Sequence, residues 1–169
     1  MGTHTWGCRQ RPAVARRDRG ASLVEFALIA PLLFALFLGM ITGGLSLSVR
    51  NSMTNSAREG ARFGATLNES ATWADSVVMR VRELAGNDLS SDQVCVKLFK
   101  KTSSGETVRQ SNPCPAAVAA YEPSSASVPV DNCAVKVWAY RQTDLETIFF
   151  TRKLDLTAVS ISRYERGCS

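Results

Sequence analysis

Histidine is nearly absent from this 169-residue chain, and its scarcity excludes several kinds of chemistry. The one histidine, His4, lies in the basic amino-terminal tail, so no Ser-His-Asp or Cys-His catalytic group and no histidine-based metal site can form beyond that tail. The chain also lacks a Walker A motif and a glycine-rich dinucleotide fingerprint. Its neighbouring carboxylates, such as Asp144 with Glu146 or Asp88 with Asp92, are more typical of a solvated surface than of catalysis. We therefore expect a protein without enzymatic activity, metal, cofactor or small-molecule substrate.

Charge is absent from a long segment near the amino terminus. From Phe26 to Val49 the chain has 24 residues without a charged side chain, which as a helix would be about 36 Å long. That length is enough to cross the roughly 30 Å hydrocarbon core of a bilayer with some tilt. A core helix of a soluble domain is one alternative, although so long an uncharged run is uncommon in a chain of this size. A secretory signal cleaved after Ser48 is another, but the apolar part of such signals has only about 7 to 15 residues.

Positive charge is concentrated before this segment. The first 20 residues contain five arginines and one aspartate, whereas the rest of the chain is nearly neutral. A nucleic-acid partner is therefore not expected, because the folded part has no excess of basic residues. An excess of arginine on one side of a span directs that side toward the cytoplasm. We expect residues 1–20 to be a leader inside the cell, residues 21–49 to be a single transmembrane helix of the cytoplasmic membrane, and the chain from Arg50 onward to lie outside.

The cysteines fit this predicted topology. Four of them follow the span and form no CxxC pair: Cys95, Cys114, Cys133 and Cys168. An even number of cysteines in an oxidising compartment predicts two disulfides, for which three pairings exist. The sequence leaves the pairing open, with a weak preference for Cys114 with Cys133 and Cys95 with Cys168. Four buried free thiols would need a reducing compartment, contrary to the predicted topology.

Helical periodicity continues beyond the span, through residues 50–86. Apolar or small residues recur every three or four positions, with charged residues on the remaining surface. They are Val49, Met53, Ala57, Ala61, Gly64 and Leu67. This pattern predicts an amphipathic extension of the transmembrane helix to about Leu67. A second short helix is predicted to begin near Trp73, with Thr72 and Asp75 as a cap pair and Gly86 as its end.

Alternation with a period of two replaces the helical pattern after Gly86. Three strands are predicted, at residues 93–99, 133–140 and 154–162. Residues 100–132 are rich in serine and proline and are predicted to be a long exposed loop that is fixed at Cys114. The segment 141–153 would join the last two strands and expose Phe149 and Phe150 unless they pack. The expected fold class is therefore α+β, with a small three-stranded antiparallel sheet and disulfides in residues 87–169.

Small residues recur at four-residue spacing within the predicted span. Ala35, Gly39 and Gly43 include a GxxxG pair, which would allow another helix to approach closely. The motif is weak by itself, because glycine is common in membrane helices. Pro31 removes a backbone hydrogen bond near the start of the span and should bend the helix there.

Glu25 is a lone acid at the cytoplasmic edge of the predicted span, and such residues are costly inside a membrane. It could be an interfacial residue that the positive end of the helix dipole stabilises. Alternatively, cleavage between Gly20 and Ala21 would create an amine one helical turn away. The carboxylate could then neutralise this amine or the amine of a neighbouring subunit.

The residues around Glu25 resemble a known processing signal. A basic leader ending in Gly20, then "ASLVEF" with glutamate at its fifth position, then an apolar helix, is similar to the prepilin signal of the type IV pilin superfamily. More narrowly, "RGASLVEFALIAPLLFALFLG" with the later "NSAREGAR" and the ending "AVSISRYE" resembles the TadE-like family of minor pseudopilins in tight-adherence (Flp-type) pili. The resemblance is strong over residues 19–62.

The resemblance implies a role for each residue of the signal. Gly20 would precede the cleavage site, Ala21 would be the mature amino terminus, and Glu25, followed by Phe26, would serve in assembly or processing. The implied partners are a prepilin peptidase, other pilin or pseudopilin subunits and the membrane. The expected function is therefore that of a minor pseudopilin or pilus-assembly subunit.

Two other functions remain open at this stage. A membrane-anchored extracytoplasmic binding or sensor domain would use the helix only as an anchor. A secreted hydrolase released after Ser48 is disfavoured by the lack of histidine.

Overall fold

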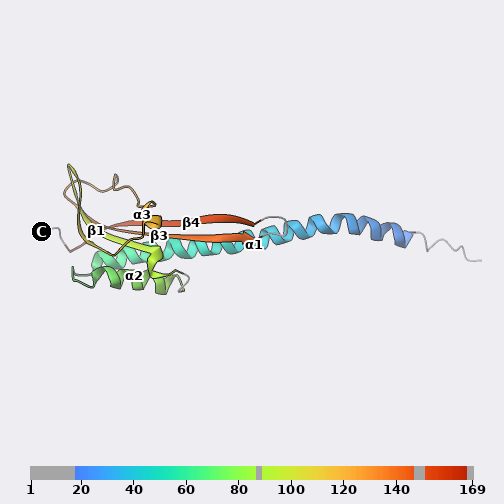
Figure 1. The fold of residues 1–169 in the computed structure, drawn as a ribbon, viewed down its shortest axis with the longest axis horizontal. Helices are drawn as coiled ribbons and strands as arrows, with labels where there is room; N and C mark the ends of the chain where they lie inside the picture. The colour runs from blue at the N-terminus through green and yellow to red at the C-terminus, as the bar shows by residue number, and fades with distance from the viewer. Residues whose placement is uncertain (1–17, 87–88, 147–150, 167–169) are drawn as a thin grey trace, which may run out of the picture. The chain divides into compact units, whose positions relative to one another are not determined.

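A computed structural model describes residues 18–86, 89–146 and 151–166 (Figure 1). The chain divides into two compact units, Met1–Ile41 and Thr42–Ser169, and we call the second unit the head. Helix α1, Asp18–Thr66, is 49 residues long and contributes to both units. The predicted helical extension is confirmed, because α1 ends one residue before the expected limit at Leu67.

The core of the head lies between a helical layer and a sheet. The helical layer consists of the last part of α1 and helix α2, Trp73–Leu84, and both helices pack against one face of the sheet (Figure 1). The buried side chains of this core include Met53, Ala57, Ala61, Ala65, Trp73, Val77, Val81, Val94, Val96, Leu98, Val135, Val137 and Ala139. The predicted apolar stripe of the extension is therefore the buried face of α1.

Helix α2 begins where the sequence predicts, but its cap differs from the expectation. Thr72 is the N-cap residue, yet its side chain makes no capping hydrogen bond, and its backbone carbonyl accepts bonds from the amide (3.0 Å) and hydroxyl (2.9 Å) of Ser76. The predicted Thr72 and Asp75 cap pair is thus wrong as a side-chain cap. Gly86 follows the helix with a φ of +68°, a left-handed conformation that glycine adopts without strain, as expected for a helix end.

The sheet has four antiparallel strands in the order β2-β1-β3-β4, not the three predicted. The strands are β1 (Val94–Thr102), β2 (Gly105–Ser111), β3 (Cys133–Glu146) and β4 (Thr151–Arg163). β2 lies inside the segment that was predicted to be a loop. It is an edge strand whose residues are all at least partly exposed, so no alternation of apolar and polar residues marks it in the sequence. A short 3-10 helix (Ser91–Gln93) and a four-residue helix α3 (Ala116–Ala119) complete the described elements.

Strands β3 and β4 extend beyond the predicted limits and form a long hairpin. β1 pairs with β3 only as far as Ala139, whereas β3 pairs with β4 out to Glu146 and Thr151. Residues 140–146 and 151–157 therefore form a two-stranded ribbon, and within the described part of the chain no third strand pairs with it. Phe149 and Phe150 lie outside the described residues.

The disulfides differ from the weakly preferred pairing. Cys95 of β1 is bonded to Cys114, 19 residues later. This bond overturns both the pairing of Cys114 with Cys133 and that of Cys95 with Cys168. Cys133 is also disulfide-bonded, and Cys168 lies outside the described residues. The sequence allowed three pairings and gave no means of choosing among them. The fold decides the pairing, because it brings Cys95 of β1 close to Cys114.

Candidate membrane segment and processing site

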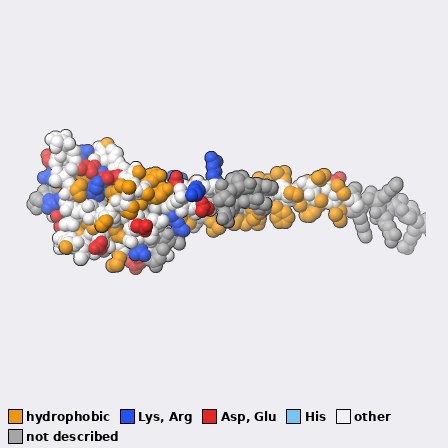
Figure 2. Space-filling view, in the orientation of Figure 1, with side chains coloured by type: hydrophobic (Ala, Val, Ile, Leu, Met, Phe, Trp, Pro, Cys, Tyr) orange, Lys and Arg blue, Asp and Glu red, His pale blue; other side chains and the backbone are white. Residues whose placement is uncertain are grey.

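The first part of α1 presents large apolar side chains on all of its surface. Figure 2 shows hydrophobic side chains along this helix, and in its most apolar 18-residue stretch the mean hydropathy is 2.4 and no residue is buried. The exposed residues include Leu23, Val24, Phe26, Leu28, Ile29, Leu32, Leu33, Phe34, Leu36, Phe37, Met40 and Ile41. A helix that is apolar all round is typical of a membrane span. The segment is therefore a candidate span of a single-pass membrane protein.

The predicted cleavage and assembly residues all lie within α1. Gly20, Glu25 and Phe26 are exposed on the helix. Ala21 and Glu25 are four residues apart, so they lie about one turn, or about 6 Å of rise, from each other. The helical spacing that the cleavage hypothesis requires is therefore present, and the cleavage itself stays a prediction.

The small residues predicted for helix packing lie on one face of α1. A Cβ atom added at Gly39 or Gly43 would meet nothing within 4 Å, so both positions have room for a larger residue. Gly43 also lies on a groove between α1 and the ribbon, with Leu154 and Leu156 of β4. Pro31 is an exposed residue inside the helix.

The segment "AREGAR", Ala57 to Arg62, has a clear structural role in the head. Ala57, Gly60 and Ala61 are buried, whereas the charged residues between them are exposed. A Cβ atom at Gly60 would collide with Cγ2 of Val81 in α2. The glycine therefore lets α1 and α2 approach closely, and the small residues of the motif form the contact surface.

A second glycine, Gly64, makes a similar contact one turn later. A Cβ atom there would lie 3.0 Å from Cγ2 of Val77, 3.1 Å from Cζ2 of Trp73 and 3.2 Å from Cγ1 of Val135. The indole Nε1 of Trp73 donates a hydrogen bond to the carbonyl of Gly64 at 3.0 Å. The sequence placed Gly64 on the packing face but gave no sign that glycine itself is needed there.

The carboxyl-terminal residues of the described chain complete the end of α1. The hydroxyl of Tyr164 donates to the carbonyl of Leu67 at 2.8 Å, and Nε of Arg166 donates to the carbonyl of Thr66 at 2.6 Å. The amide of Glu165 donates to the carbonyl of Ala65 at 3.2 Å. The last carbonyls of a helix have no partner within the helix, and a cation there is favourable. Tyr164 and Glu165 belong to the ending "AVSISRYE", which contributed to the family resemblance in the sequence. This ending therefore binds at the end of α1, the helix that contains the other residues of the resemblance.

The other face of the sheet carries a buried charge that sequence reasoning missed. Lys136 of β3 is 2% exposed, and its Nζ lies 2.6 Å from Glu106 and 3.0 Å from Glu122. The same Nζ lies 4.7 Å from the centre of the Phe99 ring. Within the alternating strand pattern this lysine is indistinguishable from a solvated residue, because its two carboxylate partners come from β2 and from the segment after α3.

These ion pairs lower the pKa of both carboxyl groups. Burial alone would raise the pKa of Glu106, but the hydrogen bond from Lys136 and the nearby positive charges hold it below its usual value. Burial opposes ionisation of Glu122 too, and hydrogen bonds from Lys97 and Lys136 lower its pKa. Both carboxylates are therefore stabilised in their charged form.

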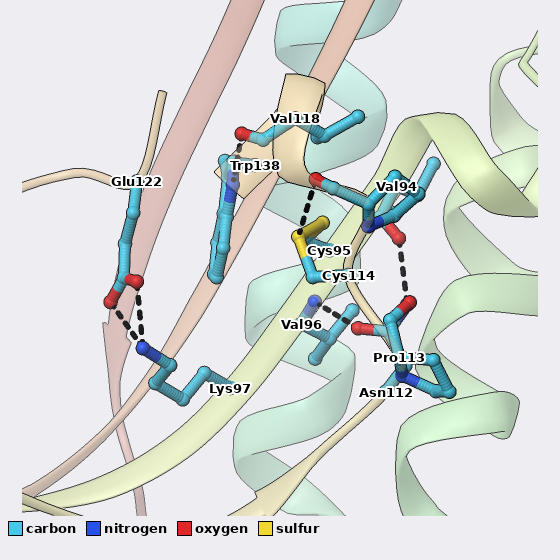
Figure 3. Close-up of a disulfide and its surroundings, with 11 residues drawn as sticks. Val94, Cys95, Val96, Lys97, Asn112, Pro113, Cys114, Val118, Glu122 and Trp138 are labelled. Atoms are coloured by element: carbon cyan, nitrogen blue, oxygen red, sulfur yellow. Dashed lines mark hydrogen bonds and ion pairs between the residues drawn. A yellow bond between two sulfur atoms is a disulfide. The ribbon is translucent and has the colours of Figure 1, made fainter. Parts of the chain in front are cut away.

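The segment after the disulfide is held on this face by further bonds (Figure 3). Lys97 contacts both carboxylate oxygens of Glu122, at 2.6 and 2.7 Å. The indole of Trp138 donates to the carbonyl of Val118 at 3.0 Å. The region predicted to be a long exposed loop is thus fixed by ion pairs and hydrogen bonds as well as by the predicted cysteine, Cys114.

Two tyrosines extend this face toward the ribbon. The rings of Tyr121 and Tyr140 are stacked, with centroids 4.6 Å apart. The hydroxyl of Tyr140 donates to Asp155 at 2.8 Å. This hydrogen bond, with the negative charge of Asp155, raises the pKa of Tyr140 to about 12. The Tyr140 proton is therefore held more tightly than that of a free tyrosine.

The comparison with known families agrees with the resemblance seen in the sequence. Residues 20–62 match the family model described as TadE-like protein. This segment resembles the TadE-like family. The match includes Gly20, Glu25, the apolar part of α1 and the AREGAR segment, and it ends before α2 begins. No curated protein and no solved structure is similar enough to the chain to match it.

Proposed function

We propose that the chain is a minor pseudopilin or assembly subunit of a tight-adherence pilus. The TadE-like match over residues 20–62 supports this function, because the matched segment contains both the Gly20 to Glu25 spacing and the apolar helix. In this proposal α1 anchors the chain in the cytoplasmic membrane with its leader inside and its head outside. The head has a binding role and performs no catalytic step.

Cleavage between Gly20 and Ala21 by a prepilin peptidase gives Glu25 a partner. The new ammonium group at Ala21 would lie one helical turn from the carboxylate. An unpaired carboxylate inside a membrane is costly, and a nearby opposite charge with good geometry offsets that cost. During assembly the amine of a neighbouring subunit can take the same place, so that Glu25 aligns one subunit against another.

Substitution of Glu25 tests the proposal. In cells with a complete tight-adherence system, Glu25→Ala should leave membrane insertion intact but reduce cleavage or recovery of the chain with pilus components at least tenfold. Glu59→Ala is a matched control, because Glu59 is exposed on the same helix within the head. Normal processing and recovery of the Glu25→Ala protein would refute the proposal and favour a binding domain that uses α1 only as an anchor.

A further inference from the structure

The ribbon of β3 and β4 lies beside a part of α1 that the sequence assigns to the membrane. Two grooves separate the ribbon from this part of the helix, with volumes of about 220 and 370 Å³. The smaller groove is lined by Thr42, Leu45, Ser46, Val49, Thr143, Asp144 and Leu156. The larger is lined by Gly43, Ser46, Leu47, Arg50, Leu154, Asp155, Leu156 and Thr157. Residues 42–50 of α1 and the ribbon therefore form one structure within the head.

The ribbon is unsuited to the hydrocarbon core of a bilayer. Within the described chain its two strands pair only with each other, so the outer edge of each strand presents backbone N–H and C=O groups without a strand partner. Open sheet edges do not occur in contact with lipid tails, because nothing there can accept or donate their hydrogen bonds. Four charged residues of the ribbon are also exposed: Asp144, Arg152, Lys153 and Asp155.

We infer that the membrane span is Ser22–Ile41 and that α1 leaves the hydrocarbon at about Thr42, roughly two turns earlier than its charge pattern indicates. Ser22–Ile41 has about 20 residues and a length of about 30 Å, which matches the thickness of the hydrocarbon core. Its end coincides with the boundary between the two compact units. Leu45 and Leu47 hide this limit in the sequence, because they continue the apolar run although both line the grooves beside the ribbon.

The shifted span changes the surroundings of two residues. The uncharged run Phe26–Val49 leaves Glu25 at its edge, whereas the span Ser22–Ile41 places Glu25 about 5 Å inside the hydrocarbon boundary, which increases its need for a cationic partner. Gly43 lies outside the hydrocarbon, so Ala35 and Gly39 are the members of the small-residue stripe that can contact another helix within the membrane.

A depth profile of α1 tests this inference, which rests on the proposed insertion of α1 but not on the pilus role. Nitroxide labels are attached to single cysteines introduced into the full chain at five exposed positions: Leu23, Leu28, Leu32, Phe37 and Leu45. The background carries Cys8→Ser, and the same protein without an introduced cysteine serves as the blank. In phospholipid vesicles, collision rates with oxygen and with a water-soluble nickel chelate report the depth of each label.

The two spans predict different profiles. We expect the ratio of oxygen to nickel collisions to be greatest at Leu32 and to be several-fold lower at Leu45, where nickel gains access. A maximum at Phe37 together with a label at Leu45 as protected as that at Leu28 would overturn the inference. If no position favoured oxygen, α1 would not be inserted, and both the span and the proposed anchoring would be wrong.

Discussion

The hydroxyl of Tyr164 donates a hydrogen bond to the carbonyl of Leu67, 2.8 Å away and 97 residues earlier in the chain. Tyr164 is buried, and Leu67 immediately follows α1. The bond joins the end of the last strand to the end of the first helix. Two segments that are distant in the sequence are therefore held together in the head.

Tyr164→Phe should weaken the head without changing its fold. The substitution removes only the hydroxyl, so the free energy of unfolding should fall by about 1 kcal/mol, a typical net value for one hydrogen bond. Urea titration of the full chain in detergent micelles, followed by tryptophan fluorescence, measures the change. Glu165→Gln is the control, since Glu165 bonds to α1 through its backbone amide. Equal stability of the two variants would contradict the role given to the Tyr164 hydroxyl.

Gly60→Ala should destabilise the head, although the substitution adds only one methyl group. The added methyl group collides with Val81 across the contact of α1 and α2, and overpacking of this kind costs about 1 to 3 kcal/mol. The same urea titration measures the loss. Gly39→Ala is the matched control, because its Cβ would meet nothing within 4 Å.

The double variant Gly60→Ala with Val81→Ala checks the cause of that loss. If the collision is responsible, the cost of Gly60→Ala should be smaller when Val81 is already truncated. A cost of Gly60→Ala that is the same in both backgrounds would show that the two residues do not interact.

Lys136→Met should remove part of the pH dependence of stability. The pKa values of Glu106 and Glu122 are lowered in the folded head, so their contribution is complete above the ordinary glutamate pKa of 4.5 and is lost as pH falls through the lowered values. Without Lys136 both carboxylates lose a buried partner, and we expect a loss of about 3 kcal/mol at pH 7. Free energies of unfolding measured from pH 7 to pH 3 should decline less steeply in the variant. An unchanged slope would show that Lys136 does not control these carboxyl groups.

The bond between Cys95 and Cys114 can be mapped directly. Proteolysis of unreduced protein should release a peptide pair that contains these two cysteines, and mass spectrometry identifies it. A peptide pair that joins Cys114 to Cys133 would contradict the observed pairing. Since the bond closes a loop of 19 residues, Cys95→Ala with Cys114→Ala should cost about 3 kcal/mol of stability.

The sequence predicted the parts of the fold in which buried residues recur at a regular spacing along the chain. Met53, Ala57 and Ala61 recur every four residues because one side of α1 is buried, so the helical extension could be read correctly. Strand β2 and residues 141–146 and 151–153 of the ribbon were missed, because these segments show no regular alternation of apolar and polar residues. The Gly86 helix end was predicted because glycine at that position has a local conformational cause.

The remaining features depend on contacts between distant segments. Lys136 becomes a buried ion-pair partner only when Glu106 and Glu122 converge on it. The collision at Gly60 requires Val81 of another helix, and the cysteine pairing requires the folded sheet. The inferred exit of α1 from the membrane could not be predicted for the same reason, since only the ribbon beside residues 42–50 distinguishes them from the apolar residues that precede them.

Amino-terminal sequencing of the chain recovered from the membrane fraction of its host cells tests the central claim most directly. If the chain is a processed pseudopilin, the mature protein should begin at Ala21, with Glu25 as its fifth residue. A protein that begins at Met1, or near Val49 as after cleavage of a secretory signal, would contradict the account.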